Sequence, residues 1–167
     1  NKKFAVSPIT THINIQNVSK NLKSQIIINK IITIHKFYKK FFKKIPKIGI
    51  LGLNPHNAEM QINSEEKKII IPSIKTLKKR GINLIGPLVS DTLFIEDYKK
   101  FDVIVGMYHD QVLTPLKTLF EYDAINITIG LPFVRVSPDH GPNEKMIGKN
   151  ISNPISLIRS LEFLDKK

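Results

Sequence analysis

The 167-residue sequence contains no cysteine, so it can form neither a disulfide framework nor a thiolate metal site. It also lacks an uninterrupted apolar run of the ~20 residues that a membrane-spanning helix requires. Its most apolar stretch, IIINKIITIHKF, is interrupted by Asn29, Lys30 and His35. No signal-peptide pattern is present either. Together these absences favour a cytoplasmic protein and indicate no membrane partner.

Acidic residues and arginine are scarce. Lys+Arg 26 against Asp+Glu 14 gives a formal net charge of +12, which would suit nucleic acid or another polyanion. Nearly all of the basic residues are lysines, however, and they occur beside abundant Ile and Asn, as a general compositional bias would produce. Arginine is scarce, and no basic stripe is interleaved with the aromatic residues on which nucleic-acid bases stack. We therefore expect solvated lysine faces and no nucleic-acid partner, with a basic polyanion-binding module as the less favoured alternative.

Segments typical of strands alternate with segments of helical periodicity along the chain. This alternation predicts an α/β fold with an open, mainly parallel sheet covered by helices on both faces. No Gly/Ser linker or internal repeat interrupts it, so residues 1–167 are expected to form a single α/β region. Strands are expected at KFAVSPI, KIGILGL, INLIG, FDVIVGMY, AINITIG and PFVRVS, with a turn at Gly86-Pro87. Helices are expected over about 19–44, 63–80, 111–120 and 154–164, and a further helical stretch is expected to begin near Ser90.

The second of these helices has a clear start signal. Asn63 or Ser64 could cap it, and Glu65 and Glu66 would fall in the first turn, where the helix dipole favours carboxylates.

Three histidines each follow a predicted strand: His12 in TTHI, His56 in NPHN and His109 in YHDQ. The carboxyl ends of the strands form the edge at which open α/β sheets bind ligands. Three neutral imidazoles that converge there would make a good divalent-metal site, although any one of them alone is more often structural. His35 differs, because it lies within the longest predicted helix among lysines, and we expect it at the surface.

A second set of polar residues comes later in the chain: Lys117, Asn126 and Arg135. Gathered at one sheet edge, they could clamp a phosphate or a carboxylate, with Arg135 as a bidentate fork and Lys117 as a point charge. On spacing alone, solvated side chains are an equally good interpretation.

Seven motifs now point to one family. TTHI, GLNPH, GPLVSDTLF, MYHDQ, LKTLF, INITIGLPFVR and DHG occur in the order typical of 4-hydroxythreonine-4-phosphate dehydrogenases, and the resemblance covers the chain from about Thr10 onward. It implies a three-layer α/β/α fold similar to isocitrate and isopropylmalate dehydrogenases, and a homodimer whose site is shared across the interface. It also implies that residues 1–167 correspond to the second half of a longer enzyme. Since the sequence begins with Asn rather than Met, we expect a partial chain.

The resemblance also implies a reaction. NAD would oxidise the secondary alcohol of 4-phosphooxy-L-threonine, a small phosphorylated amino acid, and the product would lose CO2 to give 3-amino-2-oxopropyl phosphate during pyridoxal 5'-phosphate biosynthesis. The family's metal ligands fall on His12, His56 and His109, for Zn, Mg, Co or Mn. Its substrate-binding residues fall on Lys117, Asn126 and Arg135.

The alcohol needs a proton acceptor. Asp91, Asp110 and Lys117 are candidates, and we favour Asp91 because it falls on the family's DTLF aspartate, with Lys117 as the second catalytic candidate.

The stretch SPDHGPNEKMIGKNISNP resembles the loop with which related dehydrogenases hold the adenine end of their cofactor. His140, Gly141 and Asn153 are therefore candidate NAD contacts, while a plain turn capped by Asp139 is the alternative. The absence of G-x-G-x-x-G argues against a Rossmann-type site.

Three departures from the family pattern stand out. The loop after GLNPH, NAEMQINSEE, is shorter and has no glycine, Val112 replaces the glycine that normally follows MYHDQ, and the usual Thr-Ala after DHG is lost. Two alternatives therefore stay open: an inactive fragment, and a metal-dependent hydrolase that uses the same histidines around an activated water.

Overall fold

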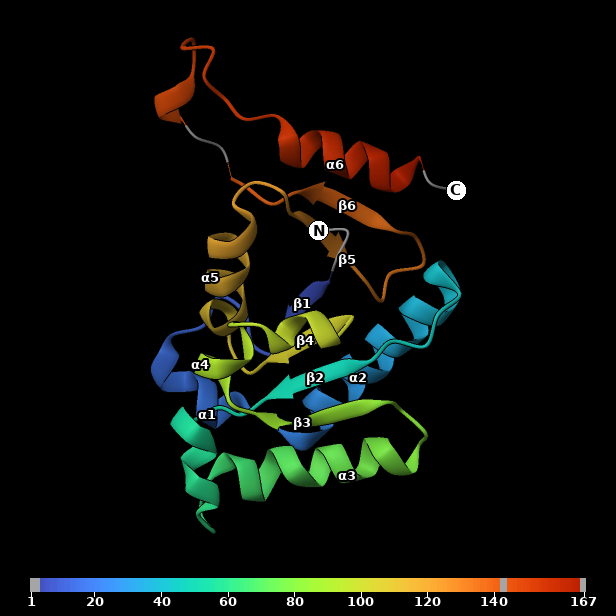
Figure 1. The fold of residues 1–167 in the computed structure, drawn as a ribbon, viewed down its shortest axis with the longest axis vertical. Helices are drawn as coiled ribbons and strands as arrows, with labels where there is room; N and C mark the ends of the chain where they lie inside the picture. The colour runs from blue at the N-terminus through green and yellow to red at the C-terminus, as the bar shows by residue number, and fades with distance from the viewer. Residues whose placement is uncertain (1–3, 142–143, 166–167) are drawn as a thin grey trace. The chain divides into compact units, whose positions relative to one another are not determined.

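The computed structural model describes residues 4–141 and 144–165, which fall into two compact units, Lys2–Pro115 and Leu116–Lys167. In the first unit, four parallel strands form one sheet in the order β1-β4-β2-β3 (Figure 1). The two central strands are buried along their whole length. This arrangement confirms the predicted α/β class with a mainly parallel sheet. The strands are β1 Ala5–Pro8, β2 Ile48–Leu51, β3 Leu84–Leu88 and β4 Val103–Gly106.

Helices connect these strands, and α2 packs against α3. None of the helices in the described part of the chain is both long and apolar enough to span a bilayer. The helices of the first unit are α1 Val18–Asn21, α2 Ser24–Phe37 with a π-helical extension Tyr38–Phe42, α3 Ile71–Lys79 preceded by a π-helical turn Glu66–Ile70, and α4 Ser90–Leu93. Short 3-10 segments lie at Ile15–Asn17, Pro55–Met60 and Asp97–Lys100.

The helix predicted over 19–44 is interrupted. Leu22 and Lys23 adopt extended conformations between α1 and α2, and the Leu22 side chain is buried. Packing of Leu22 in the core thus overrides the helical periodicity. His35, expected at the surface, is half-buried in α2, and its Nδ1 has no hydrogen-bond partner among the described residues.

The predicted start of the next helix is confirmed, because the Ser64 hydroxyl accepts a hydrogen bond from the Lys67 amide at 3.3 Å. The turn predicted at Gly86-Pro87 is wrong, since both residues lie inside β3. A Cβ at Gly86 would stand 2.2 Å from Ile50 Cγ2 and 2.4 Å from the Ile50 carbonyl oxygen. Gly86 is therefore needed for close approach of β3 to β2, where the strand register shifts.

The second unit is built on an antiparallel hairpin. Strands β5 Ile125–Thr128 and β6 Arg135–Pro138 pair directly, and α6 Ile155–Leu164 contacts both of them. The Ser156 hydroxyl donates to the Ala124 carbonyl at 2.5 Å and accepts from the Asp139 amide at 2.8 Å, which ties α6 to the ends of the hairpin. Helix α5 spans His109–Phe120, and a 3-10 turn occupies Glu144–Met146.

Candidate active site

The carboxyl ends of the four parallel strands carry the predicted site residues of the first unit. His12 follows β1, His109 follows β4 and His56 follows β2. Asp91 lies in α4, directly after β3. Because the strands are parallel and adjacent, all four residues come from one edge of the sheet. The sequence predicted this position for the three histidines.

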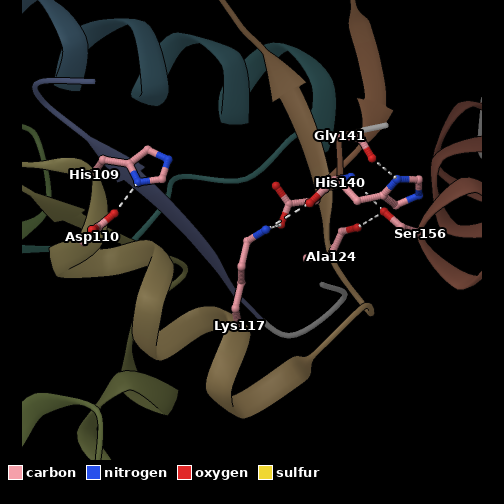
Figure 2. Close-up of polar contacts among 8 residues, drawn as sticks. His109, Asp110, Lys117, Ala124, His140, Gly141 and Ser156 are labelled. Atoms are coloured by element: carbon pink, nitrogen blue, oxygen red, sulfur yellow. Dashed lines mark hydrogen bonds and ion pairs between the residues drawn. The ribbon is translucent and has the colours of Figure 1, made fainter. Parts of the chain in front are cut away.

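Two of the three histidines are neighbours. The ring centroids of His12 and His109 are 5.6 Å apart. The segment leading to His12 is held against the end of β4, where the Thr10 amide and hydroxyl both donate to the Met107 carbonyl, at 3.1 and 2.8 Å. On the other side, His109 Nδ1 lies 2.6 Å from Asp110 Oδ1 (Figure 2). Because α5 begins at His109 rather than at the predicted Gln111, both residues fall in its first turn.

His56 belongs to a second pair. Its Nε2 lies 3.5 Å from Asp91 Oδ2, and the two side chains are 71% and 62% exposed. Like His12, whose φ is 45°, His56 has a left-handed backbone, with φ 47°. Such non-glycine conformations are costly and tend to occur at functional sites. The loop that departs from the family pattern by lacking glycine therefore still adopts a conformation that glycine would favour.

The arrangement of these two pairs shows how many ligands the histidines could supply to one metal ion. A catalytic zinc site uses three protein ligands. Within residues 4–141 and 144–165, no three His, Asp or Glu side chains gather in a way that could hold a metal ion. The described residues of one chain thus supply two neighbouring imidazoles rather than a complete site, and ligation by His12, His56 and His109 stays a prediction.

A buried carboxylate anchors the loop that carries His56. Glu66 is fully buried, and its Oε1 accepts hydrogen bonds from the Leu53 and Asn54 amides, both at 2.8 Å. The Asn54 side chain donates to Glu66 Oε2 at 3.0 Å. Burial alone would raise the pKa of Glu66, but the hydrogen bonds from Asn54 and Leu53 hold that pKa below its usual value of 4.5. Glu66 is therefore an ionised residue that fixes the start of the loop.

Gln111 is the second buried polar residue at this edge. Its Oε1 accepts from the Met107 amide at 2.6 Å, and its Nε2 donates to the Gly52 carbonyl at 2.7 Å and to the Ser90 hydroxyl at 2.9 Å. One side chain thus contacts the segments that follow β4, β2 and β3.

In the second unit, Lys117 is paired with Asp139. Its Nζ donates to the Asp139 carbonyl at 3.0 Å and lies 3.3 Å from the Asp139 carboxylate (Figure 2). The two residues line a cavity of about 320 Å³, together with Glu121, Tyr122, His140 and Ser156.

Asn126 and Arg135 lie on one face of the hairpin. In the β5–β6 register Thr128 is opposite Arg135, and residues two apart on a strand share a face, so Asn126 is a diagonal neighbour of Arg135. Arg135 uses Nη1 to donate to the Thr128 hydroxyl at 3.0 Å. Both side chains are exposed, as anion-binding groups need to be.

The candidate cofactor residues form an open loop. His140 and Gly141 are exposed, and a Cβ at Gly141 would meet nothing within 4 Å, so this segment leaves room for a ligand at the surface. Asn153 has a local structural role, since its Oδ1 accepts from the Ile155 amide at 3.0 Å at the start of α6. The role of these three residues toward NAD stays a prediction.

Comparison with known proteins identifies the family of the chain. The family model described as "Pyridoxal phosphate biosynthetic protein PdxA" matches residues 1–164. The chain belongs to the PdxA family.

Relatives of this PdxA-family chain bear consistent names. A 4-hydroxythreonine-4-phosphate dehydrogenase from Sulfurihydrogenibium sp. (strain YO3AOP1) is 48% identical over 164 residues, covering 97% of this chain and 51% of the relative. One from Bradyrhizobium diazoefficiens is 41% identical, covering 98% and 48%. The crystal structure of 4-hydroxythreonine-4-phosphate dehydrogenase from Klebsiella pneumoniae matches with a TM-score of 0.84 at 34% identity, covering 97% and 50%. The chain thus spans about half the length of the curated relatives it matches.

Sequence reasoning missed Glu66 and Gln111 as organisers of the PdxA-family site. The sequence places Glu66 only in a first helical turn, where the helix dipole favours carboxylates, and Gln111 only at the start of a helix. Their partners lie 12 or 13 and up to 59 positions away in the sequence, which no local pattern specifies. The one available signal was the position of Gln111 directly after a buried strand, beside His109.

Proposed function

We propose that this PdxA-family chain forms part of the active site of an NAD-dependent dehydrogenase that acts on 4-phosphooxy-L-threonine. The enzyme oxidises the secondary alcohol and the resulting β-keto acid loses CO2, giving 3-amino-2-oxopropyl phosphate for pyridoxal 5'-phosphate biosynthesis. The observation that carries the proposal is the placement of the three family histidines and Asp91 along one edge of the parallel sheet.

Asp91 is the proposed proton acceptor. Its carboxylate is exposed and lies 3.5 Å from Nε2 of His56, a proposed metal ligand, so it stands beside the position proposed for the substrate hydroxyl. NAD, when bound, would accept the hydride from the carbon that bears the substrate hydroxyl. Its proposed contacts are His140, Gly141 and Asn153.

The phosphate and carboxylate of the substrate need cationic partners. Arg135 and Asn126 share one exposed face of the hairpin, which supports a bidentate contact from the guanidinium and an orienting contact from the amide. Lys117, held by Asp139, adds a fixed positive charge beside the cavity of the second unit.

The remaining features of the proposal concern the whole enzyme. We propose a cytoplasmic homodimer that uses Zn, Mg, Co or Mn and whose site is shared across the interface. Within the described residues, the His12 and His109 rings are neighbours and would supply two of the proposed ligands.

A second substrate of the same class deserves a direct comparison. A relative from Oceanobacillus iheyensis, provisionally named D-threonate 4-phosphate dehydrogenase, is 39% identical over 162 residues. Its name denotes a phosphorylated hydroxy acid without the amino group, on which the same oxidation is possible.

The test uses this chain completed by the half of the Sulfurihydrogenibium relative that it does not cover. We call this chimaera the completed protein. NADH formation is followed with either phosphorylated substrate, with and without added divalent metal. NADH formation from 4-phosphooxy-L-threonine would support the proposal. NADH formation from D-threonate 4-phosphate alone would reassign the substrate. Hydrolysis of the substrate without NAD would show a hydrolase instead of a dehydrogenase.

A further inference from the structure

Gln111 lies where the segments bearing the candidate catalytic groups meet. It stands in the first turn of α5, two residues after His109, and is only 9% exposed. Its amide group has one acceptor atom and two N–H donors. Three hydrogen bonds of 2.6 to 2.9 Å engage both the oxygen and the nitrogen.

Each of these bonds leads to a different segment of the site. Gly52, whose carbonyl accepts from Nε2, directly precedes the Leu53 and Asn54 amides that Glu66 holds, and His56 follows two residues later. Ser90, the second acceptor, directly precedes Asp91.

The third bond extends the network to His12. The Met107 amide donates to Gln111 Oε1, while the carbonyl of the same residue accepts both hydrogen bonds from Thr10. Gln111 thus bonds to Gly52, four residues before His56, to the hydroxyl of Ser90, directly before Asp91, and through Met107 to Thr10, two residues before His12.

The side chain of Gln111 packs closely against the backbone of Gly106. A Cβ added at Gly106 would stand 3.0 Å from Gln111 Oε1 and 2.5 Å from Val112 Cγ1. A buried donor or acceptor that loses its partner is costly, so the three hydrogen bonds favour this arrangement of the segments.

We propose that Gln111 is a positioning residue that sets the mutual placement of the His12–His109 and His56–Asp91 pairs. It acts on these pairs through its contacts with Met107, Gly52 and Ser90. Only the kinetic consequence rests on the proposed function; the geometric consequence does not.

The test replaces Gln111 with Met, which has a similar size and no comparable hydrogen-bonding groups. Ser73→Ala is the matched control, because Ser73 is a buried polar residue away from the sheet edge. Its hydroxyl is hydrogen-bonded to the Ile69 carbonyl at 2.7 Å and to Ser24 Oγ at 2.6 Å. Two readouts are compared between the variants: the nuclear Overhauser contact between the His12 and His109 rings in this chain, and kcat/KM for NADH formation in the completed protein.

The Gln111→Met variant is expected to lose the ring contact and to lower kcat/KM about 10- to 100-fold, as loss of supporting hydrogen bonds around reacting groups does. Ser73→Ala should keep both at the wild-type level despite a similar loss of stability. An unchanged ring contact together with unchanged kcat/KM in Gln111→Met would overturn the inference, and so would equal losses in the control.

A milder variant covers the case in which Gln111→Met does not fold. Ser90→Ala removes only one of the three partners and should lower kcat while leaving the His12–His109 ring contact intact, whereas full activity in Ser90→Ala would contradict the inference. If the wild-type completed protein forms no NADH, the proposed function fails, yet the ring contact still tests Gln111 by itself.

Discussion

At the scale of single residues, buried polar groups organise the edge of the sheet. Glu66 and Gln111 contact the segments bearing His56 and His109, and both bind backbone groups and neutral side chains rather than other charges. These hydrogen bonds are needed, because burying a carboxylate without hydrogen-bond donors costs much free energy. The exposed candidate groups His56 and Asp91 are not used in this buried network.

Glu66→Gln should destabilise the chain by about 1–3 kcal/mol, because one amide nitrogen would face the donors that the carboxylate now satisfies. The pKa of Glu66 is lowered on folding, so its stabilising contribution is present above its unfolded pKa, near 4.5, and is lost as the pH falls through the lower folded value. Urea unfolding at pH 7 and below pH 4.5 measures this. The difference between wild type and variant should shrink at acidic pH, and a difference that stays constant would refute the assignment.

The neighbouring Glu65→Gln serves as the control. Glu65 is only half-buried and binds the side chains of Ser19 and Asn54 rather than backbone amides. Its substitution should cost clearly less stability than Glu66→Gln.

Asp91→Asn tests the proposed base. The amide keeps the shape of the side chain but cannot accept the substrate proton, so kcat of the completed protein should fall about 10²- to 10⁴-fold. Asp110→Asn, next to His109, is the comparison, and a larger loss there than in Asp91→Asn would move the base to Asp110.

At the scale of elements, the order of strands and helices could be predicted, and so could the strand ends that carry the site. Alternating apolar strands and amphipathic helices are local patterns, and parallel pairing brings their carboxyl ends together. The break at Leu22 and the strand through Gly86-Pro87 could not be predicted, because each depends on packing against residues far away in the chain. The same holds for the pairing of His56 with Asp91.

Gly86→Ala should therefore be strongly destabilising. The new Cβ would stand within 2.5 Å of Ile50 atoms, one of them backbone, and overpacking of this kind costs about 1–3 kcal/mol or more. Thermal unfolding should show a clear drop in Tm. Gly141→Ala, where the Cβ meets nothing within 4 Å, should leave Tm nearly unchanged, and equal effects at the two glycines would contradict the strand packing.

The hairpin makes a separate prediction. Arg135→Lys keeps the charge but loses the bidentate fork, so KM for the phosphorylated substrate should rise roughly tenfold while kcat changes less. The matched control is Arg159→Lys on α6, where the guanidinium pairs with Asp123 and Glu162. An equal rise of KM in both variants would argue against a substrate contact by Arg135.

At the scale of the whole molecule, the chain carries candidate groups for every part of the reaction but spans about half of the length of its relatives. The family and the α/β class could be predicted because motif order and periodicity are properties of the sequence. A complete metal site could not be derived in the same way, because it needs donors brought together in space, and the described residues of one chain bring two histidines together. The net charge of +12 plays no part in the proposed reaction.

One comparison of kcat/KM tests the central claim that the strand-end histidines form the active site. NADH formation from 4-phosphooxy-L-threonine is measured for the completed protein and for two variants, His109→Ala at the sheet edge and His35→Ala on α2. We expect His109→Ala to lower kcat/KM by about 100-fold or more, as the loss of a group acting in catalysis does, and His35→Ala to leave it near the wild-type value. Equal activity of the wild type and His109→Ala would contradict the account.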